Sequence, residues 1–114
     1  MSERGHLEYL ADMHEAIVRI QSYTSGVTYE QFLADHKTQD AVIRNIEIIG
    51  EAVKHMPTAI TIAHTEVEWK SIAGMRDKLV HDYFGVNMDI LWDVVTTKLP
   101  PLLGQIKDIL KNMK

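Results

Sequence analysis

Apolar residues recur at every third or fourth position along most of the chain, which is the spacing of an amphipathic α-helix. The first such stretch covers about residues 7–23, where Leu10, Met13 and Ile17 fall on one stripe. Gly26 follows this stretch and indicates its end. Strand-like alternation of apolar and polar residues does not extend over any length, so the pattern predicts helices.

A short helix and a second long helix are predicted next. Thr28 followed by Gln31 has the form of a capping box, which begins a short helix through Leu33. Residues 38–56 then carry apolar side chains at helical spacing. Pro57 should stop this second long helix, because proline cannot continue one.

The next part of the chain has a gap between two helical patterns. Residues 58–65 are predicted as a linker that leads into a third long helix. That helix is expected over residues 66–83, with Ile72 and Leu79 on its apolar stripe. Gly85 follows as a typical terminator.

The last segment, residues 88–114, has helical spacing that is interrupted by two prolines. Pro100 and Pro101 should kink or split it. Because the expected loops are short, sequential helices should be antiparallel neighbours. We therefore predict an all-α fold, an up-and-down bundle of four or five helices, in one domain over residues 1–114.

The composition fits such a core and excludes several classes of protein. Hydrophobic residues make up 46% of the 114 positions, which is enough for one continuous core. There is no cysteine, so neither disulfides nor a thiolate zinc site can hold the fold together. The first residues are charged, and no run of about 18 apolar residues occurs. We therefore expect a cytoplasmic protein with no membrane partner.

The net charge of −4 gives no general attraction to nucleic acid. A local basic patch remains, because Lys70, Arg76 and Lys78 outnumber Asp77 in that stretch. The histidines lack metal-ligand spacing, and the methionines fall at core spacing. The sequence therefore predicts no metal ion and no cofactor.

Charged and aromatic residues crowd the stretch RDKLVHDYFGVN, residues 76–87. A histidine can exchange a proton near neutral pH, and an arginine can bind phosphate oxygens through two hydrogen bonds. His81 could remove the proton from a ribose 2′-hydroxyl, while Arg76 stabilises the charge that builds on the phosphate oxygens. Such a pair suits cleavage of RNA without a metal, because DNA lacks that hydroxyl.

Helical geometry places these two residues on different faces. Arg76 and His81 are roughly 140° apart at about 100° per residue, so they converge only through the reach of the arginine or across a second subunit. This spacing favours a dimer. The alternative is a solvated helix face with pairs such as Asp77 and His81, and with Tyr83 at the edge of the core.

The pattern R-x4-H-x-Y, filled by Arg76, His81 and Tyr83, resembles the signature of the HEPN superfamily. Specifically, it resembles that of the HepT-like toxins encoded beside minimal nucleotidyltransferases. Three longer segments look like the same family, in the same order: AVIRNIEIIGEAVKHMP (41–57), EWKSIAGMRDKLVHDYFGVN (68–87) and LWDVVTTKLPPLL (91–103). The resemblance covers essentially the whole chain, with the N-terminal part least distinctive.

The resemblance implies a HEPN-like bundle that forms a homodimer, with Arg76 and His81 of each subunit meeting at the interface as a metal-independent endoribonuclease centre. It also implies the toxin of a type VII toxin–antitoxin system. A cognate minimal nucleotidyltransferase, the antitoxin, would silence RNA cleavage by adding AMP to Tyr83, since this places anionic bulk where RNA phosphate should sit. Asp77 would orient His81 or Arg76, with a local ion pair as the alternative.

Three charged residues, Arg44, Glu47 and Glu51, share one polar stripe on the second long helix, and the resemblance extends through them. One interpretation is structural, as an ion pair within the helix or a clamp on the third helix. The other is that Glu51 and Arg44 support the catalytic residues.

Two other classes of function remain open. A non-catalytic helical binding module would dock the nucleotidyltransferase or present a substrate to it, and would use the same residues as a phosphate pocket. The acidic net charge slightly favours this class. A purely structural dimerisation domain would need none of these side chains. Exchange of Arg76 or His81 for alanine would therefore separate the three hypotheses.

Overall fold

The computed structural model describes residues 5–79 and 87–113, and these residues form helices and connecting turns without a strand. The elements are α1 (His6–Thr24), α2 (Tyr29–Leu33), α3 (His36–Lys54), α4 (Thr58–Ala63), α5 (Trp69–Ala73), α6 (Met75–Leu79), α7 (Met88–Asp93), the π-helical turn η1 (Val94–Lys98) and α8 (Leu99–Asn112). The all-α fold class predicted from the apolar spacing is confirmed.

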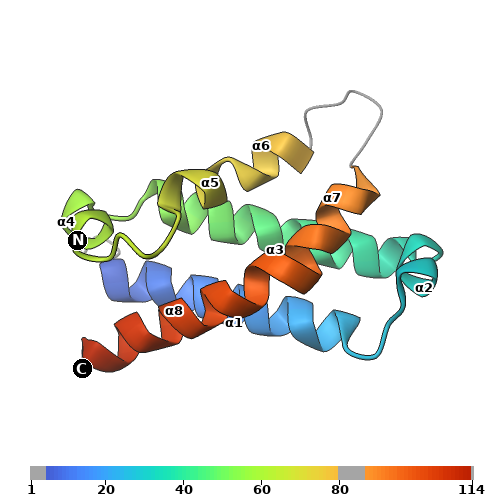
Figure 1. Ribbon diagram of the computed structural model, residues 1–114, viewed down its shortest axis with the longest axis horizontal. Coiled ribbons are helices and arrows are strands. Elements are labelled where there is room, and N and C mark those ends of the chain that lie inside the picture. Colours follow the sequence, from blue (N-terminus) through green and yellow to red (C-terminus); the bar gives the residue numbers. More distant parts are fainter. Residues whose placement is uncertain (1–4, 80–86, 114) are drawn as a thin grey trace.

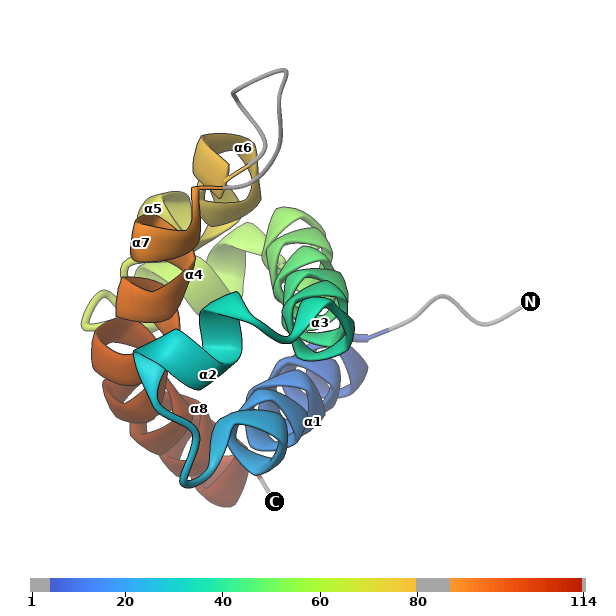
Figure 2. The ribbon, with the colours of Figure 1, turned by 90° about the vertical axis from the view of Figure 1, so that its right-hand side faces the viewer.

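The core is enclosed by α1, α3, the α5–α6 pair and the continuous series from α7 to α8 (Figure 1, Figure 2). Helices α1 and α3 lie side by side and run antiparallel, α8 packs on α1, and α5 and α6 pack on α3. Helix α7, η1 and α8 follow one another as the fourth rod. The expected bundle therefore appears as four rods, with α2 and α4 as short additional helices.

The apolar stripes predicted for the first two long helices form the centre of the core. Leu10 and Ile17 of α1 and Ile49 of α3 are fully buried, and Leu99 and Ile106 of the fourth rod meet them. Burial of large apolar side chains is the main favourable term in folding. Among the helices of the described residues, none is long and apolar enough to cross a membrane.

Side-chain caps set the start of α2 and α3. The Thr28 hydroxyl accepts a hydrogen bond from the Gln31 backbone N–H at 3.1 Å, and the Gln31 side chain accepts one from the Thr28 N–H at 2.9 Å. The predicted capping box is therefore present. Asp35 caps α3 by accepting from the Thr38 N–H at 3.1 Å. Helix α3 consequently begins at His36, slightly before the expected position.

The predicted linker over residues 58–65 is wrong in part, because α4 (Thr58–Ala63) occupies most of it. Pro57 precedes the first turn of α4, where its missing N–H and fixed φ angle are compatible with a helix. No residue of α4 is fully buried, and Ile62 is 69% exposed. A helix without a buried face leaves no periodic pattern in the sequence, which is why this one was missed.

The third long helix expected over residues 66–83 is also wrong in part. The described portion is divided into α5 and α6 at Gly74, which is the C-cap residue of α5. Glycine lowers helix stability by about 1 kcal/mol relative to alanine, so a break here is physically reasonable. The expected helix end at Tyr83 and its terminator Gly85 lie outside the described residues.

The two consecutive prolines interrupt regular α-helix, as expected. The Leu99 N–H donates to the Val94 carbonyl, five residues back, which is π-helical register. Pro100 has no N–H, so it cannot donate the α-helical bond to the carbonyl of Thr96. Helix α8 restarts with Pro100 and Pro101 in its first turn, where prolines are tolerated.

Candidate functional site

Arg76 lies in the first turn of the five-residue helix α6 (Met75–Leu79). Leu79, at the end of the same helix, is 2% exposed and anchors it in the core, and α6 packs on α3. The backbone of Arg76 therefore belongs to a helix that Leu79 anchors, while its side chain lies outside the described part. His81 and Tyr83 also lie outside the described residues, so the predicted R-x4-H-x-Y group stays a prediction from the sequence.

The charged residues nearest to Arg76 in the sequence are exposed. Asp77 and Lys78 on α6 and Lys70 on α5 are exposed. The two lysines give the predicted basic patch a surface location. The expected contact between Asp77 and His81 involves a residue outside the described range.

The last residues described before position 80 and the first ones described after position 86 lie near one another. Lys78 of α6 and Ile90 of α7 line one groove of about 360 Å³ between the α5–α6 rod and the α7–α8 rod. Glu66 and Gln105 also line this groove, and the Gln105 side chain donates to the Glu66 carbonyl at 3.0 Å. Residues 80–86, which include His81 and Tyr83, follow Leu79 and precede Asn87 in the sequence.

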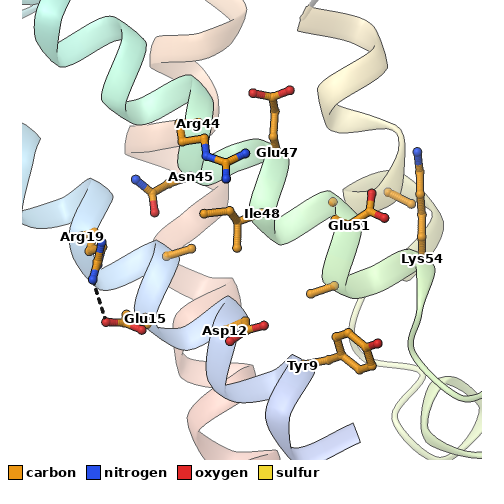
Figure 3. Close-up of a pocket in the computed structure, with 14 residues that line it drawn as sticks. Tyr9, Asp12, Glu15, Arg19, Arg44, Asn45, Glu47, Ile48, Glu51 and Lys54 are labelled. Carbon is orange, nitrogen blue, oxygen red and sulfur yellow. Dashed lines mark hydrogen bonds and ion pairs between the residues drawn. The ribbon is translucent and has the colours of Figure 1, made fainter. Parts of the chain in front are cut away.

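A larger polar groove of about 710 Å³ runs between α1 and α3 (Figure 3). Arg44, Glu47 and Glu51 of α3 all line it, so the predicted polar stripe faces one shared space. Ala73 at the end of α5 lines it as well, three residues before Arg76. The groove therefore extends from α1 to the helix that leads into α6.

Charges of both signs line this groove. It contains three cations and four carboxylates: Arg19, Arg44, Lys54, Asp12, Glu15, Glu47 and Glu51. Arg19 pairs with Glu15 at 3.0 Å, with side chains 57% and 64% exposed. An ion pair this exposed contributes at most about 0.5 kcal/mol. Because carboxylates outnumber cations, the groove as a whole does not favour RNA phosphate.

Sequence reasoning missed the contribution of α1 to this groove. Tyr9 lines it and stacks on His55, with ring centres 5.5 Å apart and planes at 16°. The His55 Nδ1 atom lies 2.9 Å from the Glu51 carbonyl oxygen. The available signal was a second stripe on α1 at helical spacing, Tyr9, Asp12 and Arg19, which borders the apolar one.

Two titratable groups of the described residues have clearly shifted pKa values, and both lie away from this groove. The pKa of Tyr29 is raised, chiefly by its hydrogen bond to Asp89. The pKa of Asp35 is lowered, chiefly by the hydrogen bond from the Thr38 side chain at 2.6 Å. In the part of the chain that the structure describes, no three histidine, aspartate or glutamate side chains gather where they could hold a metal ion.

Comparison with known proteins extends over nearly the whole chain. The "Probable ribonuclease HepT" of Thermococcus cleftensis is 46% identical over 109 residues, which cover 96% of this chain and 99% of the relative. A protein of Methanocaldococcus jannaschii that is provisionally named an RNase is 43% identical over 114 residues, covering 100% of this chain and 94% of the relative.

A third relative, from Caldanaerobacter subterraneus, also bears a provisional RNase name and is 41% identical over 97% of this chain and 96% of its own length. No solved structure matches the chain. The family model for "Ribonuclease HepT-like" matches residues 13–109, a span that includes the polar stripe of α3, the helix carrying Arg76, and both His81 and Tyr83. The chain therefore belongs to the ribonuclease HepT-like family.

Proposed function

We propose that this chain is a metal-independent endoribonuclease and the toxin of a type VII toxin–antitoxin system. The observation that carries the proposal is membership in the HepT-like family over residues 13–109, together with the complete motif Arg76, His81 and Tyr83. The names of its relatives add support, because they are ribonuclease names. The whole chain, residues 1–114, would act as one HEPN-like domain.

The proposed reaction is attack of the ribose 2′-hydroxyl on the adjacent phosphate. His81 takes the proton of the hydroxyl as general base, the 2′-oxygen forms a bond to phosphorus, and the bond to the 5′-oxygen breaks. The leaving 5′-oxygen is then protonated. Arg76 stabilises the negative charge on the phosphate oxygens. No metal is needed because these two side chains supply proton transfer and charge stabilisation.

A homodimer is part of the proposal. On one continuous helix the two residues would point roughly 140° apart, so a second subunit is the direct way to bring them to one phosphate. A C2 dimer would place two identical centres across its axis. The exposed lysines beside Arg76, Lys70 and Lys78, would then contact flanking RNA phosphates.

Regulation would act on Tyr83. A cognate minimal nucleotidyltransferase would transfer AMP from ATP to its hydroxyl and release pyrophosphate. The attached AMP would add negative charge and bulk two residues from His81. RNA phosphate and the attached AMP would compete for Arg76. Asp77 would orient His81 or Arg76 from its exposed position on α6.

Glu51 and Arg44 would support the site from α3. Both line the groove that reaches Ala73, and α6 follows directly from α5 and packs on α3. Their role would be to hold the α5–α6 rod against α3, because neither is part of the catalytic motif. Exchange of either should therefore reduce activity less than exchange of His81.

One observation favours a second function, a non-catalytic binding module. The groove between α1 and α3 carries four carboxylates and three cations, and this mixture suits a protein surface better than RNA. Such a module would dock the nucleotidyltransferase or present a substrate to it. Arg76 and His81 would then form a phosphate pocket.

Growth of bacteria that express the chain alone tests these two functions. Under the ribonuclease proposal, the chain inhibits growth, while His81→Ala or co-expression of the neighbouring nucleotidyltransferase restores it. Purified protein should cleave RNA equally well with and without EDTA. Harmless expression of the intact chain, with tight binding of the nucleotidyltransferase, would support the binding module instead.

A further inference from the structure

The groove between the α5–α6 pair and the series from α7 to α8 has no part in the proposed reaction. Its volume is about 360 Å³. Pockets that bind small molecules typically enclose roughly 300–1,000 Å³, so the groove is large enough for one flat ring system. We call it the α6–α7 groove, because both of these helices line it.

Apolar side chains from both sides form the floor of the α6–α7 groove. Ile90, Val94 and Thr97 follow one another at steps of four and three residues, so they share one helix face, and all three line the groove. Ile72 and Met75 line it from α5 and α6. Ile72 and Val94 are 7% and 4% exposed, whereas Ile90 is 38% exposed. An apolar surface therefore continues from the core to the solvent.

The polar groups of this groove are mostly hydrogen-bond acceptors. Three carboxylates line it, and an ionised carboxylate can only accept: Glu66, Glu68 and Asp93. The Gln105 side-chain nitrogen already donates to the Glu66 carbonyl at 3.0 Å, which leaves its amide oxygen as a further acceptor. Asp93 is exposed and has no ion-pair partner among the described residues, so its carboxylate is available to a ligand.

The two consecutive prolines add a backbone acceptor. In an α-helix the Thr97 carbonyl would accept from the N–H of residue 101, but Pro101 has none, and Pro100 cannot supply a shorter bond either. Within its own helix, this carbonyl can accept only from the Leu102 N–H, five residues on. Thr97 and Pro101 both line the groove. The π-helical turn therefore leaves acceptor capacity at the groove, and such turns often occur at functional sites.

Two lysines supply positive charge to the same groove. Lys78 lines it from α6, and Lys98 lines it from the end of η1. Both are exposed. Met75 and Lys78, which come one residue before and two residues after Arg76, are both lining residues. The groove thus borders the helix that carries the arginine proposed to bind RNA phosphate.

We propose that the α6–α7 groove is a nucleobase subsite for single-stranded RNA, and that it prefers bases with an exocyclic amino group. The inference rests on the proposed function and adds a base preference to it. The apolar floor covers the faces of a base that is turned out of the strand. Asp93 accepts a hydrogen bond from the amino group, and Lys78 and Lys98 contact flanking phosphates. Uracil has a carbonyl oxygen where cytosine has its amine, so uracil would face an acceptor with an acceptor.

A segment of a partner protein is the other occupant that an apolar groove of this kind could take. A docked amphipathic helix would offer no free backbone N–H to the Asp93 carboxylate or the Thr97 carbonyl, because its own N–H groups are bonded internally. A base with an amino group offers such donors and an apolar face together. The excess of acceptors therefore favours the base.

Cytosine and uracil are matched probes, because the main difference between them is amine against carbonyl. Purified wild-type chain should cleave oligocytidylate with a kcat/KM about three- to tenfold higher than oligouridylate of the same length. Binding is measured separately on ¹⁵N-labelled His81→Ala. Cytidine monophosphate should shift the backbone amide signals of Ile90, Asp93 and Thr97, with a dissociation constant about three- to tenfold below that of uridine monophosphate.

Asp93→Asn tests the acceptor directly. It replaces one carboxylate oxygen with an NH₂ donor that can serve the uracil oxygen, so the ratio of the two kcat/KM values should fall to about one. Asp108→Asn is the matched control, because it removes the same charge from an exposed position on α8 that does not line the groove. Its ratio should equal that of wild type.

The outcomes separate this subsite from the function on which it rests. If wild type cleaves both oligonucleotides equally well and His81→Ala cleaves neither, the subsite is wrong and the ribonuclease stands. A preference for cytidine that persists in Asp93→Asn also overturns the subsite. If nothing is cleaved but cytidine monophosphate still binds more tightly and shifts these amides, the ribonuclease proposal fails and the groove stands as a nucleobase site. If the nucleotidyltransferase shifts them and neither nucleotide does, the groove is a protein-docking surface and the subsite is wrong.

Discussion

The two halves of the bundle are built differently. Helices α1 and α3 have 19 residues each and bury five and eight residues, respectively. Helices α5 and α6, which precede residues 80–86, have five residues each, whereas α7 has six residues, buries one and continues without a break into η1 and α8. Long helices with wide apolar faces hold themselves together, whereas short ones depend on what they contact. Arg76 thus belongs to a short helix whose position depends on tertiary contacts with α3.

The largest expected effect separates chemistry from stability. His81→Ala should lower RNA cleavage by about 10²–10⁴-fold, because it removes the proposed general base, and the melting temperature should hardly change. Steady-state cleavage assays and thermal unfolding measure the two quantities. Arg19→Ala, which breaks only an exposed ion pair, is the activity control. If His81→Ala lost activity only because it unfolds, the proposed separation of catalysis from stability at His81 would be wrong.

The long-helix half should respond in the opposite way. Ile46 of α3 is 1% exposed, so Ile46→Ala should lower the free energy of unfolding by about 2–5 kcal/mol. Urea denaturation followed by circular dichroism measures this loss. Ile62→Ala removes the same atoms from a side chain that is 69% exposed and should cost almost nothing. Equal losses at the two positions would show that core burial is misassigned.

Gly74→Ala tests whether the break between α5 and α6 can be closed. An added Cβ would lie 3.5 and 3.7 Å from the carbonyl oxygens of Lys70 and Ser71, which is ordinary contact, and the φ of −82° suits alanine. Stability should therefore rise by about 1 kcal/mol, by helix propensity alone. Urea denaturation checks this. A gain in stability with lower cleavage activity would indicate that the break itself is needed for function.

The Asp35 cap should make the stability of the half that contains α1 and α3 depend on pH. Its pKa is lowered from 3.8 by the hydrogen bonds of Thr38, so its contribution to stability is present above that value. This contribution is lost as the pH falls through the lower pKa of the folded state. Melting temperatures between pH 5 and about pH 2 should therefore fall more steeply for wild type than for Asp35→Asn, which caps without titrating. Parallel curves would contradict the assignment.

The smallest effect concerns the groove between α1 and α3. Glu15→Gln removes the ion pair with Arg19. Because both side chains of this pair are more than half exposed, the free energy of unfolding should change by at most about 0.5 kcal/mol. The change should shrink in 1 M salt because screening removes what remains of the attraction. Urea denaturation at low and high salt measures it. A larger loss would mean that the pair is part of a wider network in the groove.

The predictions from sequence succeeded where structure depends on neighbours along the chain. The stripes of Leu10 and Ile17 and of Ile46 and Ile49 are buried as expected, since apolar periodicity is a local property. The Thr28 capping box likewise joins residues three positions apart. Helix α4 was missed because it buries no face, and the break at Gly74 was missed because the apolar spacing continues across it.

The amino-acid sequence by itself determined the all-α class and the helical stripes, and it contains the R-x4-H-x-Y pattern of Arg76, His81 and Tyr83. Tertiary structure alone decided that α1 shares a groove with Glu51 and that Tyr29 reaches Asp89. The physical reason is separation along the chain. Helix stripes and caps arise between residues three or four positions apart, whereas these contacts join side chains across about 40 and 60 positions, and they form only after the rods have packed.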